Sequence, residues 1–331
     1  MSRPLGVIVA LVLLTVGCGS DDPVSPYSVT VVVQGLDGPT QLAVTDEAWF
    51  VAHLNGAEGA AAGQVLRLNP EDLDAAPVVV LDGLQKPTGV AVFAGQLWVM
   101  EQRRLTRGAL DGSNRVVVVD DMAYNGRSQG TLTVDGDRLL FDTSGSTRLP
   151  PGPDGSPVEI SGALWAVDAD GTITNVAWGF KHAYAHVVTA DGTLWTTEMS
   201  DGSFDGVPAT DELVAVREGA DHGWPVCVGD NRPVEDAGVA DPCRGVPRSQ
   251  AVFGPGATPT GIAVSPWNSS RLLVALWVDA QIVEVDIRAA APAPAVVITA
   301  ELDRPQHLVV DGSQLFVTDH AAGTIVAIEP R

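Results

Sequence analysis

The sequence predicts an all-β protein folded as a six-bladed β-propeller. Three observations support this prediction: a two-strand motif recurs six times, the first strand has no partner near it in the sequence, and turn-forming residues are abundant. The 331 residues include 35 Gly and 23 Pro, which fits many short strands better than long helices. No window of comparable length carries the 3.6-residue apolar period of an amphipathic helix.

The recurring motif consists of an alternating apolar strand, a turn that often contains Asp-Gly, and a second strand rich in Leu, Trp and Val. A third strand often follows, as in residues 64–68, 162–167 and 281–285. The copies begin at Pro39, Pro87, Gly130, Ala183, Pro259 and Pro305, with a mean spacing of about 53 residues. This pattern is typical of propeller blades. Two unrelated β-domains are the alternative, but no Pro/Ser-rich linker divides the repeats.

A propeller of six blades has to be closed, because an open ring would leave two unpaired sheet edges. The sixth copy of the motif runs out of chain after its third strand, near Ile328. Residues 28–33 form an apolar strand that can supply the missing fourth strand. We therefore expect residues 28–331 to form one propeller domain in which the N-terminal strand closes the last blade.

The N-terminal segment has the features of an export signal. Arg3 precedes an apolar run over residues 5–16, which is too short to span a bilayer. The Gly17-Cys18 pair that follows resembles a bacterial lipoprotein signal, so we expect a signal peptide over 1–17, a lipidated Cys18 and a tether over 18–27. The alternative is an ordinary secretory signal with an incidental cysteine. The prediction is an exported, lipid-anchored protein of the bacterial cell envelope, either in the periplasm or at the cell surface.

Cys227 and Cys243 are the remaining cysteines, and they share one Gly/Pro-rich stretch. In an oxidising compartment this arrangement favours a disulfide, and the alternatives are two free thiols or a metal-binding pair.

The chain is strongly acidic, with 41 Asp and Glu against 19 Lys and Arg and a net charge of −22. A nucleic-acid partner is excluded because a phosphate backbone requires a basic surface. Electrostatic docking on an anionic membrane is excluded for the same reason, so the expected membrane contact is the lipid anchor alone.

In a propeller the start of each inner strand and the end of each second strand open onto one face around the axis. Both lysines and four of the six histidines fall at such positions, although solvated loop residues are the alternative. The candidates at strand starts are Gln41, Lys86, Thr88, Arg127, Gln129, Lys181, His182, Tyr184 and His307. Those at second-strand ends are His53, Glu101, Arg103, Glu198, Trp277, Asp319 and His320.

The loop over residues 198–212 concentrates acidic side chains. Its five carboxylates belong to Glu198, Asp201, Asp205, Asp211 and Glu212. Hard oxygen ligands between Gly and Pro turns suit calcium, although the spacing is not that of an EF-hand loop. The prediction is a calcium site in this loop, with a solvated acidic loop as the alternative.

Residues 178–228 carry the most specific pattern in the chain. The segments 191–195 (DGTLW), 211–213 (DEL) and 223–225 (GWP) match a phrase of the bacterial glucose/sorbosone dehydrogenase family, which this region resembles. The resemblance implies a soluble six-bladed propeller that uses pyrroloquinoline quinone (PQQ) and calcium. It also implies a small sugar or aldehyde as substrate, with hydride transfer to the quinone.

The chain departs from the family where the chemistry is expected. The family's cofactor-contacting Arg-Asn pair is Lys181-His182 here, and the Tyr before Gly-Trp-Pro is His222. The family's catalytic histidine opens the third blade, where this chain has Gln129. We expect His182 to serve as the base, because the reaction requires a group that titrates near neutral pH. The cofactor contacts that the resemblance implies are Arg127, Gln129, Lys181, Tyr184, His222 and Trp224.

Three functions remain open from the sequence. The first is a divergent PQQ-dependent sugar or aldehyde dehydrogenase. The second is a non-catalytic propeller lipoprotein whose degenerate site binds a ligand or a partner, since folds outlast activities. The third is a metal-dependent lactonase, to which Glu101, Glu198 and Asp319 could contribute ligands.

Overall fold

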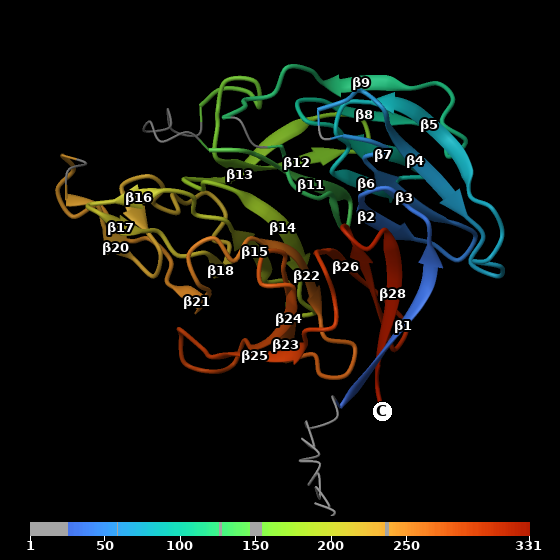
Figure 1. The fold of residues 1–331 in the computed structure, drawn as a ribbon. Helices are drawn as coiled ribbons and strands as arrows, with labels where there is room; N and C mark the ends of the chain where they lie inside the picture. Colours follow the sequence, from blue (N-terminus) through green and yellow to red (C-terminus); the bar gives the residue numbers. More distant parts are fainter. Residues whose placement is uncertain (1–25, 58, 126–127, 146–153, 236–237) are drawn as a thin grey trace, which may run out of the picture.

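The computed structural model describes residues 26–331 except 58, 126–127, 146–153 and 236–237. The predicted signal peptide, Cys18 and Arg127 therefore lie outside the described residues. The described part is all-β and contains six four-stranded antiparallel sheets arranged around one axis. In Figure 1 the inner strands β2, β6, β14, β22 and β26 converge on the centre of the molecule. The prediction of a six-bladed propeller is confirmed.

Each blade consists of four strands that run from the axis outward. Blade 1 contains β2 (Pro39–Val44), β3 (Trp49–His53), β4 (Gly63–Leu68) and β5 (Val78–Leu84). Blade 2 contains β6 (Gly89–Phe93), β7 (Gln96–Met100), β8 (Leu105–Gly108) and β9 (Val116–Val119). Blade 3 contains β10 (Thr133–Asp135), β11 (Arg138–Thr143), β12 (Ala163–Asp168) and β13 (Ile173–Trp178). Blade 4 contains β14 (Ala183–Val188), β15 (Leu194–Glu198), β18 (Glu212–Ala215) and β21 (Ser249–Val252). Blade 5 contains β22 (Pro259–Val264), β23 (Arg271–Leu276), β24 (Gln281–Asp286) and β25 (Ala295–Thr299).

Blade 6 is assembled from both ends of the chain. It contains β26 (Pro305–Asp311), β27 (Gln314–Asp319), β28 (Thr324–Pro330) and, at its outer edge, β1 (Tyr27–Gln34). β1 pairs antiparallel with β28, with Val29 opposite Ile328 and Val31 opposite Val326. The predicted closure of the last blade by the N-terminal strand is confirmed.

The threonines of the repeated motif connect neighbouring blades. Thr40, Thr131 and Thr260 lie at or just before the start of an inner strand and are buried, and the hydroxyl of each donates to a backbone carbonyl of the next blade. The pairs are Thr40 to Pro87 at 2.9 Å, Thr131 to Tyr184 at 3.2 Å and Thr260 to Pro305 at 3.0 Å. The motif therefore encodes contacts between blades as well as strands within them.

The core lies between the blades. Between blades 2 and 3, Trp98 and Trp165 are buried together with Phe141 and Met100. These large side chains come from second and third strands, which explains why apolar residues recur there in every copy of the motif.

Blade 4 carries a long excursion between its strands, seen at the left of Figure 1. It contains two hairpins, β16 (Ser203–Phe204) with β17 (Val207–Pro208) and β19 (Cys227–Val228) with β20 (Arg232–Pro233). Cys227 and Cys243 form a disulfide that closes part of this excursion, as predicted.

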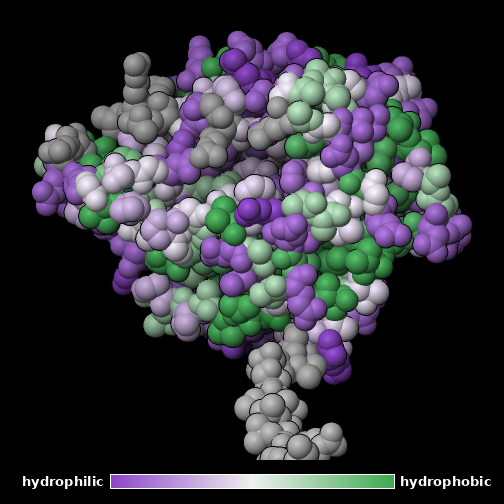
Figure 2. All heavy atoms as spheres, in the orientation of Figure 1, coloured by the Kyte–Doolittle hydropathy of each residue, from purple (hydrophilic) through white to green (hydrophobic). Residues whose placement is uncertain are grey.

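The surface in this view is mostly hydrophilic along its upper part, while apolar side chains gather in the lower half (Figure 2). None of the described residues belongs to a helix long and apolar enough to cross a bilayer.

Candidate functional site

A cavity of about 450 Å³ opens where the inner strands begin, and we call it the axial cavity. Every blade contributes to it, through Thr40, Thr88, Ser128, His182, Thr260 and Gln306. Lys86, Tyr184, Trp277 and His320 line it as well. The structure thus brings together six of the candidates at strand ends, from blades that are far apart in the sequence.

His182 is the histidine of this cavity that has a buried acid beside it. It directly precedes β14 of blade 4, while Asp142 lies on β11 of blade 3. The Asp142 Oδ2 atom is 3.9 Å from His182 Nδ1. Both residues are buried, and Oδ2 has no hydrogen-bond partner. An imidazole beside a carboxylate is the arrangement that orients a histidine base.

Asp142 is held by its other oxygen, which accepts the backbone N–H of Gly130. Burial raises the pKa of Asp142 to about 8, because no solvent stabilises the ionised form. Sequence reasoning missed this residue. The available signal was a carboxylate in the apolar second strand 138–143 (RLLFDT), since the matching strand 96–100 (QLWVM) has none.

Gln129, which replaces the family's histidine, does not line the axial cavity. It is fully buried, and its amide nitrogen donates to the carbonyls of Gln102 and Ala123. Its amide oxygen accepts the N–H of Ser144. Both ends of the side chain are therefore engaged in holding the loop before blade 3 together.

Lys181 points away from the axial cavity. Its Nζ donates to the Gly145 carbonyl at 3.2 Å and lies 6.0 Å from the centre of the Trp224 ring. His222 stacks on Phe180, and burial lowers the pKa of its imidazole to about 4. The predicted cofactor contacts Lys181, His222 and Trp224 are thus separated from His182 and Tyr184.

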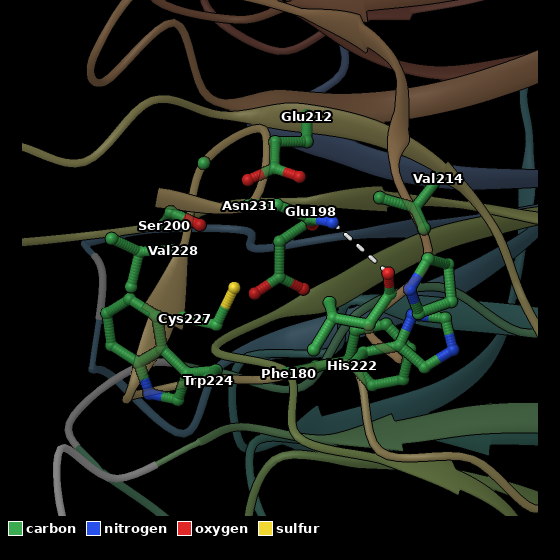
Figure 3. A pocket seen from close by; sticks show the side chains of 13 residues that line it. Phe180, Glu198, Ser200, Glu212, Val214, His222, Trp224, Cys227, Val228 and Asn231 are labelled. Atoms are coloured by element: carbon green, nitrogen blue, oxygen red, sulfur yellow. Dashed lines mark hydrogen bonds between the residues drawn. The ribbon is translucent and has the colours of Figure 1, made fainter. Parts of the chain in front are cut away.

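A second, much smaller cavity of about 20 Å³ lies within blade 4, and we call it the blade-4 cavity. It is large enough for a single water molecule or ion. Figure 3 shows Glu198, Glu212, Ser200 and Asn231 around it, together with His222 and Trp224. Glu198 and Glu212 stand opposite each other in the pairing of β15 with β18.

Both glutamates are buried, and one oxygen of Glu198 accepts the backbone N–H of Lys181. Burial raises the pKa of Glu198 well above its ordinary value and that of Glu212 to about 7. The hydroxyl of Ser249 donates to Glu212, whereas Glu198 Oε2 has no hydrogen-bond partner. A buried carboxylate oxygen in this position can accept a cation.

The other carboxylates of the acidic loop lie elsewhere. Asp211 accepts the N–H groups of Ser200 and Thr258, and burial raises its pKa to about 6. Asp201 lines the axial cavity, and Asp205 is exposed and accepts the N–H of Glu235. The five predicted ligands do not converge, and the described residues contain no group of three or more His, Cys, Asp or Glu arranged to hold a metal.

No family model and no curated protein matches this sequence. The fold, however, resembles solved structures over most of the chain. The calcium structure of a Carbohydrate-Active Enzymes family AA12 protein from Trichoderma reesei is 17% identical with a TM-score of 0.74, covering 92% of this chain and 96% of that one.

Two bacterial structures are also similar. The PQQ-bound aldose sugar dehydrogenase from Streptomyces coelicolor is 17% identical with a TM-score of 0.69, covering 92% of this chain and 98% of that one. The soluble aldose sugar dehydrogenase from Escherichia coli in its apo form is 15% identical with a TM-score of 0.72, covering 92% and 100%. These likenesses establish the class of protein as a propeller with the architecture of these enzymes.

Proposed function

We propose that this chain is a PQQ-dependent sugar dehydrogenase in which His182 is the base. The observation that carries the proposal is the imidazole of His182 in the axial cavity with the carboxylate of Asp142 beside it. The likeness in fold to a PQQ-bound aldose sugar dehydrogenase supports the cofactor, and the family resemblance of residues 178–228 supports the sugar substrate.

The axial cavity fits a polar, anionic ring system. Its volume lies within the range of about 300–1,000 Å³ that is usual for small-molecule sites. Three of its polar atoms have no hydrogen-bond partner, namely Thr88 Oγ1, Ser128 Oγ and Trp277 Nε1. Lys86 would supply a positive charge for the carboxylates of PQQ, and the three unpartnered atoms could bond to other polar atoms of the cofactor.

The role of PQQ, when bound, is to accept a hydride from the substrate carbon. The protein's own task is to take the hydroxyl proton. If Asp142 accepts a hydrogen bond from His182 Nδ1–H, the lone pair is on Nε2, which then faces the substrate hydroxyl. The carboxylate also stabilises the imidazolium that forms when the proton arrives.

The blade-4 cavity is the proposed calcium site. Glu198 and Glu212 supply two carboxylates, and Ser200 and Asn231 can add side-chain oxygens. A divalent cation there would remove the cost of burying two acids side by side. We propose this cavity as the calcium site in place of the full set of five carboxylates in the acidic loop, because Asp205 of that loop faces solvent.

The lactonase alternative finds less support. Glu101 is paired with Arg115 and accepts the N–H of Gln85. Asp319 accepts the N–H groups of Asp303 and Arg304, and Glu198 lies in the blade-4 cavity. The three carboxylates are thus engaged outside the axial cavity and leave no axial ligand set for a catalytic metal.

Export with a lipid anchor at Cys18 remains a proposal of the same kind. It rests on the sequence of residues 1–22 and agrees with the disulfide, since disulfides persist in oxidising compartments. Incorporation of labelled fatty acid into the whole chain, and its loss in Cys18→Ser, tests it.

The test of the function uses the purified protein with added PQQ and calcium. We expect bound quinone absorbance and reduction of an artificial dye in the presence of aldoses. His182→Gln should still bind PQQ but lose turnover. His53 lies outside the axial cavity, so His53→Gln should remain active and serves as the control. Failure to bind PQQ at high concentration would favour the non-catalytic alternative, and full activity of His182→Gln would exclude this histidine as the base.

A further inference from the structure

The central channel has a second cavity at its opposite end. All six inner strands run in the same direction around the axis, so their first residues line the axial cavity and their last residues meet at the other mouth. A cavity of about 460 Å³ lies there, and we call it the distal funnel. Every blade contributes at least one valine to its lining, among them Val44, Val92, Val134, Val187, Val264 and Val310.

Polar side chains lie across the channel near its two cavities. Gln41 of blade 1 donates to the Leu132 carbonyl and accepts the N–H groups of Val90 and Leu132. At the floor of the axial cavity, Gln306 of blade 6 donates to the Tyr184 hydroxyl of blade 4 at 2.8 Å. A molecule in the distal funnel therefore occupies a site different from that of the proposed cofactor.

The lining of the distal funnel carries no charge. None of the described residues that form it is Asp, Glu, Lys or Arg, in a chain whose net charge is −22. Its titratable members are His186 and His307, and burial lowers the pKa of these imidazoles to about 4 and about 3. Both are neutral at physiological pH, so the funnel disfavours an ion and accepts an uncharged molecule.

Three buried polar atoms in this lining have no hydrogen-bond partner. They are His186 Nδ1, His307 Nδ1 and Ser265 Oγ. Such atoms are rare in folded proteins, because a buried polar group without a partner is costly. Two of them come from imidazoles that are at least nine-tenths buried. They indicate a ligand that brings its own hydroxyl or carbonyl group.

We propose that the distal funnel binds a small uncharged molecule whose apolar body packs against the valines and whose hydroxyl or carbonyl group bonds to His307 or His186. An apolar cavity of this size with a few convergent polar groups is the usual form of a small-molecule site. The proposal does not depend on PQQ or on catalysis at the axial cavity.

The test compares three probes that share one ring system: 1-naphthol, naphthalene and 1-naphthalenesulfonate. Binding to the whole protein, with the axial cavity saturated with PQQ or left free, is measured by ligand-detected NMR and calorimetry. We expect one molecule of 1-naphthol per chain, about five- to tenfold weaker naphthalene, and weaker or undetectable sulfonate. Absence of 1-naphthol binding would overturn the proposal.

Variants locate the bound probe. The double variant His307→Leu/His186→Leu should remove the advantage of 1-naphthol over naphthalene, leaving naphthalene affinity unchanged, and the single variants show which imidazole makes the contact. Val134 is 46% exposed at the rim. Val134→Asp should weaken the binding of both probes about fivefold or more without unfolding the protein. Val117→Asp is the matched control, since Val117 is 48% exposed on the outer strand β9. Equal effects of the two aspartates, or weakened binding in Trp277→Ala of the axial cavity, would contradict the assignment.

Discussion

Asp142 Oδ2 and His182 Nδ1 lie 3.9 Å apart although the two residues belong to neighbouring blades. The carboxylate is fully buried, and Gly130 holds its other oxygen. The position of the imidazole therefore depends on how blade 3 packs on blade 4. This makes the pair a sensitive place to test the proposed function.

Asp142→Asn preserves the acceptor for Gly130 but replaces Oδ2 with an amide group that cannot accept the His182 proton. We expect kcat/KM for aldoses to fall about 10²- to 10⁴-fold, because the imidazole loses its orienting partner. The measurement is steady-state dye reduction with PQQ. Asp168→Asn, an exposed acid on β12 of the same blade, is the control. A decrease shared by both variants would point to a general disturbance of blade 3.

In the wild-type protein, the proposed function predicts that the same pair sets the pH dependence of catalysis. Burial raises the pKa of Asp142 to about 8, so below that pH the pair holds an additional proton and fewer molecules carry a competent base. We expect kcat/KM to rise with pH through about 8. A profile that is flat from pH 6 to 9 would show that the pair does not control proton removal.

Stability should fall as pH rises between about 7 and 8.5 when calcium is absent. Burial raises the pKa of Asp142 to about 8, that of Glu212 to about 7 and that of Glu198 well above its ordinary value. These acids are ionised in the unfolded chain, so the folded state binds more protons and loses stability as it releases them. The histidines whose pKa is lowered by burial act in the opposite direction, but above about 7 an unfolded imidazole is mostly neutral, so their effect is smaller there.

Urea unfolding at about pH 7, 7.75 and 8.5 in EDTA measures this slope. Both Asp142→Asn and Glu212→Gln should reduce it. A free energy of unfolding that increases over this interval would contradict the assignment of raised pKa values to the three acids.

Calcium should stabilise the protein through the blade-4 cavity. At a calcium concentration of about 100 times Kd, the expected gain is about 2.7 kcal/mol in the free energy of unfolding. Glu212→Gln should abolish most of this gain, whereas Asp205→Asn should preserve it because that side chain faces solvent. The readout is the shift in Tm on adding calcium. If Asp205→Asn lost the calcium-induced shift in Tm, the calcium site would lie in the acidic loop instead.

Thr40 and Thr88 provide a matched pair for the contacts between blades. Both follow a proline near the start of an inner strand and are 4% exposed, but only the Thr40 hydroxyl has partners, the carbonyls of Pro87 in blade 2 and Ala52 in its own blade. Thr40→Val should cost about 1–3 kcal/mol, because it leaves a buried carbonyl with fewer donors. Thr88→Val should cost little stability and instead weaken PQQ binding. Equal losses in stability would show that the hydroxyl bond to blade 2 is unimportant.

The fold was predictable because the repeated motif reports both strand alternation and blade number. The axial cavity was partly predictable, since His182, Tyr184, Lys86 and Trp277 stand at strand ends that any propeller brings together. The directions in which the side chains point were not predictable from the sequence. Lys181 neighbours His182 but turns toward the Gly145 carbonyl, because successive residues of an extended chain face opposite sides.

The acidic residues show the same limit. Glu198 and Glu212 meet because β15 pairs with β18, a register that the spacing of the acids does not reveal. Asp205 sits in the turn of the hairpin β16–β17, away from that cavity. The role of Asp142 was not predictable, because a single acid near the end of an apolar strand looks like a solvent-exposed residue in the sequence. Its position beside His182 depends on the packing of the neighbouring blade.

The closure of blade 6 has a consequence for how the molecule is made. Ser28 bonds to Glu329, 301 positions away, so the ring cannot close before β28 has been synthesised. Until then the early blades form an open arc with an unsatisfied sheet edge. The order of synthesis thus delays the native state until β28 is available, and a chain without β1 or without β28 would remain an unclosed arc.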